Sequence, residues 1–109
     1  MGAAVSRVLL LIALTACFVA CLDDGSADPA AAGRRAYMAS CIACHSLDPG
    51  RDGTLGPAIA GSSRELIEAR VLRAEYPPGY EPKRDTKLMP AQPFLASQID
   101  ILAAYLALP

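Results

Sequence analysis

Two cysteines and a histidine stand close together near the middle of the chain, in the pentapeptide Cys41-Ile42-Ala43-Cys44-His45. The spacing Cys-x-x-Cys-His is the attachment signature of a c-type haem. On one helical turn, Cys41 and Cys44 can each form a thioether with a vinyl group on the same edge of the porphyrin. His45 is then carried under the ring, where its imidazole can bind iron. The pentapeptide therefore predicts one covalently attached haem c with His45 as the proximal iron ligand.

A zinc site, a redox dithiol and a chance match are the alternative interpretations of this pentapeptide. Structural zinc sites usually need a second pair of Cys or His ligands, and His45 is the only histidine of the chain. A thioredoxin-type dithiol is expected beside a βαβ pattern, and no segment alternates convincingly as a strand. Haem attachment is the interpretation that we favour.

The second axial ligand of the iron is predicted by elimination among three methionines, Met1, Met38 and Met89. Met1 opens an apolar segment that we assign below to an export signal. Met38 lies three residues before the first cysteine, on the helix that holds the proximal side. Met89 lies 44 residues after His45, next to a proline, on a stretch that can reach the other face. A lone methionine is often only core filler, but here the sequence favours Met89 as the ligand.

The stretch from Glu75 to Pro93 is rich in proline and has no pattern of regular structure. A loop of this length inside a small domain is uncommon unless it has a function, and we expect it to cover one haem face. Its prolines restrict the unfolded chain, which helps to hold a weak iron–sulfur bond. Tyr76 and Tyr80 are candidates to hydrogen-bond haem propionates, or are surface aromatics. Lys83 and Lys87 are the fallback nitrogen ligands, mainly when deprotonated at high pH.

The first twenty residues read as an export signal, which covalent haem attachment to an exported protein would also require. Arg7 is followed by a continuous apolar run, and a short basic region before such a run is typical of a signal peptide. From Val8 to Leu22 there are only fifteen residues, whereas a spanning helix needs about 20. A retained membrane helix is therefore the less favoured interpretation, and we expect the protein in the periplasm or another extracytoplasmic space.

Two further cysteines, Cys17 and Cys21, lie at the end of this signal. Leu14-Thr15-Ala16-Cys17 resembles the bacterial lipobox, in which a leucine and two small residues precede a lipidated cysteine. Phe18-Val19-Ala20-Cys21 is a weaker match, but Cys21 stands where the chain turns polar. The alternatives are that the signal is discarded whole, or that the two cysteines form a disulfide in an exported protein. We favour a lipid anchor at Cys17 or Cys21, which would bring the protein to a membrane.

The remaining chain divides into a tether over residues 21–32, which is small, acidic and turn-forming, and a folded unit over residues 33–109. Without Arg7 of the signal, nine basic residues face eleven acidic ones, a net charge of −2. Nucleic-acid binding normally needs a concentrated basic surface, so we expect no such partner. A unit this small usually needs a staple besides its core, and a covalently held porphyrin would supply one.

Three helical stretches are predicted, and together they indicate an all-α fold. The first runs from about Ala30 into the Cys41–His45 motif. The second begins at Ser62 or Ser63, where Ser62-Ser63-Arg64-Glu65 has the pattern of a capping box before an apolar periodicity. The third begins near Ser97, with Asp100 three residues later, and has few polar residues on any face, so we expect it to be buried.

In this order, the motifs of the chain resemble those of the class I cytochromes c, which are small monohaem electron carriers. Gly33-Arg34-Arg35-Ala36-Tyr37 resembles the glycine and aromatic of the family's first helix, and Ala103-Ala104-Tyr105-Leu106 resembles the aromatic end of its last helix. Gly56-Pro57-Ala58-Ile59-Ala60-Gly61 resembles the family's Gly-Pro-x-x-x-Gly, and Leu88-Met89-Pro90 its Met-Pro. The stretch from Glu75 to Pro93 departs from the family in its wealth of proline and tyrosine.

The resemblance implies three or four helices packed around one covalently bound haem, with the first and last helices crossing. It also gives the Pro57 carbonyl the role of accepting the second N–H of the His45 imidazole, a contact that iron-bound histidines almost always make. Gly56 would allow the close approach of the chain, although an ordinary turn proline is the alternative for Pro57.

The function that follows is single-electron transfer by iron cycling between Fe(III) and Fe(II), in a bacterial respiratory or photosynthetic chain. With His45 and Met89 both bound, no coordination position is left for a substrate, so we expect a carrier and not an enzyme. The alternatives are a relay subunit of a larger oxidoreductase complex, or a gas-binding or peroxidatic haem protein if Met89 does not bind iron. We expect redox proteins as partners, and membrane complexes of such a chain in particular.

A short cluster of basic residues, Lys83, Arg84 and Lys87, precedes the candidate methionine. A charged patch beside a haem edge can steer a partner of opposite charge and is screened by salt. The cluster thus suggests a docking surface for an acidic partner. The alternative is that Glu81 and Asp85 balance these solvated charges.

Overall fold

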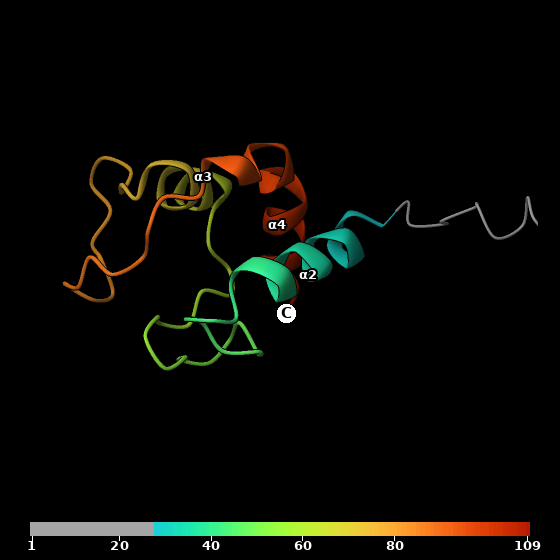
Figure 1. Ribbon diagram of the computed structural model, residues 1–109, viewed down its shortest axis with the longest axis horizontal. Helices are drawn as coiled ribbons and strands as arrows, with labels where there is room; N and C mark the ends of the chain where they lie inside the picture. Colours follow the sequence, from blue (N-terminus) through green and yellow to red (C-terminus); the bar gives the residue numbers. More distant parts are fainter. Residues whose placement is uncertain (1–27) are drawn as a thin grey trace, which may run out of the picture.

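The computed structural model describes residues 28–109, which contain three α-helices and one 3-10 helix and no strand. The elements are α2 (Pro29–Ser40), α3 (Arg64–Arg73), η1 (Pro93–Gln98) and α4 (Ile99–Leu106). Figure 1 shows α2 crossing α4, with α3 at the other end of α4 and long loops joining the elements. The predicted all-α fold is thus confirmed. The predicted export signal, Cys17 and Cys21 lie outside the described residues.

Helix α2 begins earlier than the folded unit that we expected from Gly33. The Asp28 carboxylate accepts a hydrogen bond from the Ala30 backbone N–H at 2.9 Å, and Pro29 follows at the first helical position. An aspartate cap and a proline at this position both favour a helix start. The last four residues of the predicted tether, residues 29–32, are therefore helical.

We expected the first helix to run into the motif. The motif instead follows α2 as a hydrogen-bonded turn outside the helix. Helix α2 ends at Ser40, and the Cys41 carbonyl accepts hydrogen bonds from the backbone N–H groups of Cys44 at 3.2 Å and of His45 at 2.9 Å. The two cysteines and the histidine therefore still lie within one turn of the backbone.

Helix α3 is capped by one serine and not by the predicted capping box. The Ser63 hydroxyl accepts a hydrogen bond from the Leu66 backbone N–H at 3.2 Å, which makes Ser63 the N-cap residue. The third residue after this cap is Leu66, so Glu65 is one position too early to close a capping box. The Ser62 hydroxyl instead donates a hydrogen bond to the Ile59 carbonyl at 2.6 Å.

Helix α4 also begins differently from the prediction. The 3-10 helix η1 occupies the residues around Ser97, and α4 starts at Ile99 after Gln98, which makes no side-chain capping bond. Asp100 forms an ion pair with Arg64 at the start of α3, with the Nε–Oδ1 distance at 2.6 Å. The acidic residue in the first turn therefore links two helices and does not cap its own.

The core lies where α2, α3, η1 and α4 meet. Its buried members are Ala36, Tyr37, Ile67, Val71, Leu95, Ile99, Leu102 and Leu106. The rings of Tyr37 on α2 and Tyr105 on α4 lie with their centroids 5.4 Å apart and their planes tilted by 54°, a favourable geometry for an aromatic pair. Within residues 28–109, no helix combines the length and apolar character needed to cross a bilayer.

Tyr37 also connects α2 to the segment after the motif. Its side chain is fully buried, at 0% exposure, and its hydroxyl donates a hydrogen bond to the Ser46 carbonyl at 2.5 Å. Burial, with smaller contributions from Cys41 and Tyr105, raises the pKa of the Tyr37 hydroxyl from 10.0 to about 12.

We therefore expect Tyr37 to contribute to a loss of stability at alkaline pH. Between pH 10 and about 12, the unfolded chain loses the phenolic proton that the folded protein still holds, so the free energy of unfolding falls as pH rises. Tyr37→Phe should remove this part of the decline and cost roughly 1 kcal/mol at neutral pH for the lost hydrogen bond. Urea unfolding from pH 7 to 12 measures both effects. An alkaline decline that is equally steep in Tyr37→Phe would contradict this expectation.

Tyr105→Phe is the matched control for this series. Its ring packs against Tyr37, but its hydroxyl makes no hydrogen bond within the described residues. The control should therefore keep the alkaline decline of the wild type.

Candidate functional site

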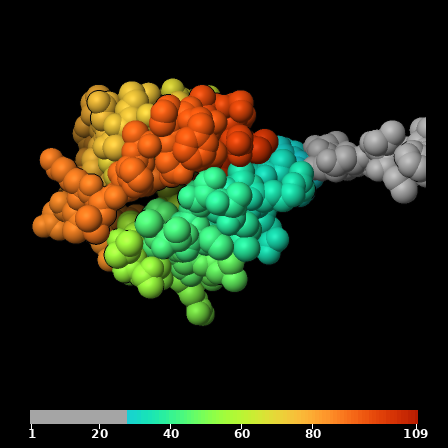
Figure 2. All heavy atoms as spheres, in the orientation of Figure 1, coloured from blue at the N-terminus to red at the C-terminus, as the bar shows by residue number. Residues whose placement is uncertain are grey.

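An open cavity lies between the motif, α3, α4 and the long loop before η1. Its empty volume is about 1030 Å³, part of which is open to solvent. Figure 2 shows it as a hollow between the green loops after the motif and the orange segment that precedes η1. All seven residues that the sequence singled out as cofactor contacts line this cavity, namely Cys41, Cys44, His45, Pro57, Tyr76, Tyr80 and Met89.

The imidazole of His45 is oriented by the chain that follows it. Its Nδ1 atom lies 3.0 Å from the Pro57 carbonyl oxygen. Because a carbonyl can only accept, this bond requires the proton on Nδ1 and leaves the Nε2 lone pair available to a metal. The geometry is the one that the resemblance implied for Pro57.

Gly56 makes this arrangement sterically feasible. A Cβ at Gly56 would lie 2.5 Å from Cε1 and 2.6 Å from Nδ1 of the His45 ring, closer than real contacts allow. The backbone N–H of Gly56 also donates to the Cys44 carbonyl at 2.9 Å. The loop is thus folded tightly over the motif, and the missing side chain of Gly56 leaves room for the imidazole.

The two motif cysteines are partly buried at the cavity and are not paired in a disulfide. Burial, with a smaller contribution from Cys44, raises the pKa of the Cys41 thiol to about 11. Cys41, Cys44 and His45 line the same cavity, as two thioether bonds and one iron ligand for a single porphyrin would need.

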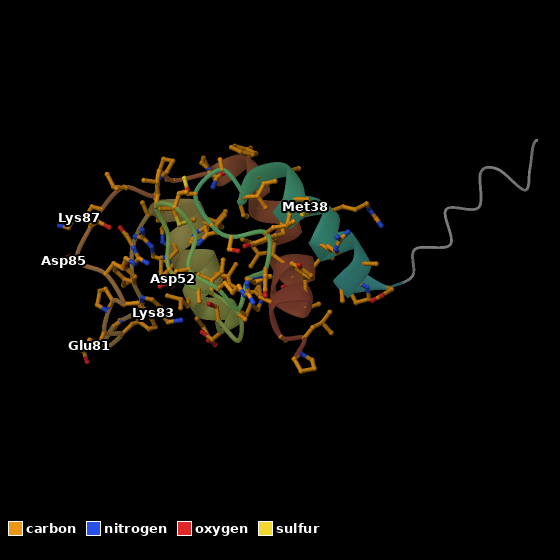
Figure 3. The ribbon with its side chains drawn as sticks, turned by 90° about the horizontal axis from the view of Figure 1, so that it is seen from below. Met38, Asp52, Glu81, Lys83, Asp85 and Lys87 are labelled. Carbon is orange, nitrogen blue, oxygen red and sulfur yellow. The ribbon has the colours of Figure 1, made fainter. Side chains whose placement is uncertain are left out.

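Among the described methionines, the structure separates Met89 from Met38 as the sequence predicted. Met89 is partly buried and lines the cavity, whereas Met38 lies on α2 and is not among the lining residues. Figure 3 shows Met38 on the helix, far from the loop that carries residues 81–87. Of the fallback ligands, Lys83 lines the cavity but donates its ammonium to the Ala58 carbonyl at 2.7 Å, and Lys87 is exposed outside the lining.

Tyr76 and Tyr80 form one side of the cavity together with a residue that sequence reasoning missed. Their rings stack with centroids 5.4 Å apart and planes only 9° from parallel. The guanidinium carbon of Arg70 on α3 lies 4.3 Å from the Tyr76 ring centroid, as in a cation–π contact. No sequence pattern marks Arg70, because its place here depends on how the chain after α3 turns back over the helix.

The residues present fit a covalently held haem. The walls are mostly apolar and come from α3 and α4, including Ile67, Val71, Leu102 and Leu106. The cavity brings together two thiols, one imidazole nitrogen held by its second hydrogen bond, and one thioether sulfur. Thioether and imidazole donors on one iron are typical of a low-spin haem site of the cytochrome c kind.

Comparison with known proteins agrees with this site. The family model described as Cytochrome c matches residues 30–108, which is well over half of the chain. Neither the curated proteins nor the solved structures that we searched gave a match. The match confirms the resemblance inferred from the motifs and the helical fold around the cavity. The chain therefore belongs to the cytochrome c family, whose members bind covalently attached haem c.

Proposed function

We propose that the protein is a single-electron carrier of a bacterial respiratory or photosynthetic chain, and not an enzyme. Family membership supports haem-based electron transfer with redox proteins as partners. The observation that carries the finer proposal is the convergence of His45, oriented by the Pro57 carbonyl at 3.0 Å, and Met89 on the same cavity. If His45 and Met89 both bind the iron, the chain would leave no coordination position for a substrate.

In this proposal the haem supplies a one-electron couple, and the chain decides how the couple behaves. Cys41 and Cys44 would hold the porphyrin covalently, and His45 Nε2 and the Met89 sulfur would bind its iron. A thioether ligand and apolar walls both raise the reduction potential relative to nitrogen ligation. The walls also keep water away, so that little solvent reorganises when an electron moves.

We also propose that Tyr76 and Tyr80 contact the haem propionates, as the sequence suggested. Their stacking on one another and the guanidinium of Arg70 over Tyr76 place hydroxyl groups and a positive charge at the same wall of the cavity. Propionates are anionic, so a cation beside two hydroxyl donors is a favourable environment for them.

Cytochrome c domains are generally extracytoplasmic in bacteria, and an export signal over residues 1–20 agrees with this location. We propose further that lipidation of Cys17 or Cys21 tethers the domain to a membrane, so that it shuttles electrons between membrane complexes. Mass spectrometry of the native protein would detect an acylated N-terminal cysteine, and an unmodified mature N-terminus would exclude the anchor.

The haem should remain with the polypeptide when the native protein is extracted with acidified acetone. Thioether bonds from Cys41 and Cys44 survive this treatment, whereas a haem held only through iron does not. The double variant Cys41→Ala, Cys44→Ala is the control, and any haem that it binds should pass into the acetone. Colour that leaves the wild-type protein would contradict covalent attachment.

A further inference from the structure

Two loops face each other across the cavity and are joined by polar contacts from distant parts of the chain. The Lys83 ammonium donates to the Ala58 carbonyl at 2.7 Å, and Arg84 Nη2 lies 3.3 Å from Asp52 Oδ2. The second oxygen of Asp52 accepts a hydrogen bond from the Ala58 backbone N–H at 2.8 Å. We call these four residues, Asp52, Ala58, Lys83 and Arg84, the polar clasp.

Along the sequence, the residues of the polar clasp lie between the two predicted iron ligands, His45 and Met89. Ala58 directly follows Pro57, whose carbonyl orients His45. Lys83 and Arg84 precede Met89 by six and five residues, and Ala58, Lys83 and Arg84 all line the cavity. The clasp therefore connects the loop that follows His45 to the loop over residues 81–91 that carries Met89, which we call the methionine loop.

The methionine loop has little else to hold it by polar contacts. Residues 81–91 contain no helix, and their backbone groups make no backbone–backbone hydrogen bond within residues 28–109. Segments with few such contacts open easily. Figure 3 shows Lys83 on the side of Asp52, whereas Glu81, Asp85 and Lys87 lie at the outer edge of the loop.

These contacts change the interpretation of the basic cluster. Two of its three members, Lys83 and Arg84, are bound within the molecule, and only Lys87 extends outward without a hydrogen bond or ion pair among the described residues. Asp85 lies next to Lys87 at the outer edge of the loop, and Glu81 lies further along the same edge. Lys83 and Arg84 therefore have a structural role within the molecule, and their role in docking stays a prediction.

We propose that the polar clasp holds the methionine loop closed over the cavity and sets how readily Met89 leaves the iron. Asp52 is the central positioning residue, because its carboxylate binds Ala58 on its own loop and Arg84 on the other. When the clasp opens, the loop swings away and the distal position becomes accessible to small ligands. The proposal rests on Met89 being an iron ligand, as proposed above.

The expected effect of one contact is modest. The side chains of Arg84 and Asp52 are 38% and 68% exposed, and ion pairs at such positions change an equilibrium by roughly 2- to 5-fold and weaken with salt. Opening should therefore become faster by about this factor when the pair is removed, and salt should speed the opening of the wild type.

The test is the binding of imidazole to the oxidised holoprotein, followed by stopped flow. At saturating imidazole, the rate reaches a limit that equals the rate at which Met89 leaves the iron. Asp52→Asn keeps an oxygen that can accept from Ala58 but loses the charge opposite Arg84, and Lys83→Leu removes the contact to the Ala58 carbonyl without adding a possible iron ligand. Each variant should raise the limiting rate by roughly 2- to 5-fold.

Two matched controls lie on the same loop. Asp85→Asn and Lys87→Leu make the same chemical changes at exposed side chains that have no polar partner among the described residues. Both should keep the wild-type limiting rate. Raising the ionic strength should accelerate the wild type and Lys83→Leu but have little effect on Asp52→Asn, because its ion pair is already absent.

The outcomes separate this proposal from the one on which it rests. If the wild type reaches a limiting rate and Asp52→Asn and Lys83→Leu match their controls, the clasp is refuted while Met89 remains the ligand. If the wild type shows neither an iron–sulfur band nor a limiting rate, Met89 ligation fails and the clasp fails with it. Should Asp52→Asn not fold, Arg84→Gln breaks the same ion pair from the other side and carries the same expectation.

Discussion

Met89→Ala should abolish the weak near-infrared sulfur-to-iron band of the oxidised protein. Its reduction potential should fall by on the order of 0.1 V or more, since axial ligands shift haem potentials over a range of about 0.8 V. The physical reason is that a thioether stabilises Fe(II) relative to Fe(III), and the water or other hard ligand that replaces it does not. Absorption spectra at neutral pH and a redox titration of the purified variant measure the two effects.

Met38→Ala is the control for this substitution. Met38 is the other methionine of the described chain, but it lies on α2 and not at the cavity. Its replacement should leave the band and the potential as they are. A band that persists in Met89→Ala would exclude Met89 as the ligand, because another sulfur would then have to bind the iron.

Gly33→Ala should destabilise the protein by roughly 3 kcal/mol or more, at the upper end of the cost of overpacking. A Cβ at Gly33 would overlap the Ile101 carbonyl oxygen and lie 2.8 Å from the Tyr105 Cβ. Because the obstacle is backbone, α2 and α4 would have to move apart at their crossing. The loss is a large part of the 5–15 kcal/mol that holds a typical domain folded.

The sign of this effect is informative, because alanine is the better helix former by about 1 kcal/mol at an exposed site. Arg34→Ala, at the next position of α2, should be near neutral because the Arg34 side chain is exposed. Urea unfolding of the oxidised holoproteins gives both values. A Gly33→Ala protein as stable as the wild type would mean that the two helices do not approach this closely.

Sequence reasoning located best those elements whose structure is determined by a few neighbouring residues. The spacing of Cys41, Cys44 and His45 predicts covalent haem without any knowledge of the fold, because the three side chains act through one turn of chain. The apolar periodicity likewise predicted three helices, and α3 begins one residue after the Ser63 that was one of two expected starts. The order of short motifs then predicted the family that the comparison confirms.

The errors concern residues whose partners are distant in sequence. The third helix was expected to begin near Ser97, yet α4 begins at Ile99, and Asp100 in its first turn pairs with Arg64, 36 residues away. Glu65 was expected in a capping box, but the helix begins one residue later than that box requires. A local sequence pattern cannot show whether a carboxylate caps its own helix or pairs with a distant residue, because either partner can provide its hydrogen bond.

The sequence by itself determined which chemistry this protein can perform: two thiols and an imidazole at a fixed spacing, one thioether able to reach the far side, and helices enough to enclose a haem. Only the tertiary structure decided how the loops meet around that chemistry. It brought Arg70 onto Tyr76, and it joined Lys83 to Ala58 across 25 residues. The physical reason is that covalent spacing and helix periodicity are properties of a few consecutive residues, whereas contacts between loops depend on how the whole chain packs.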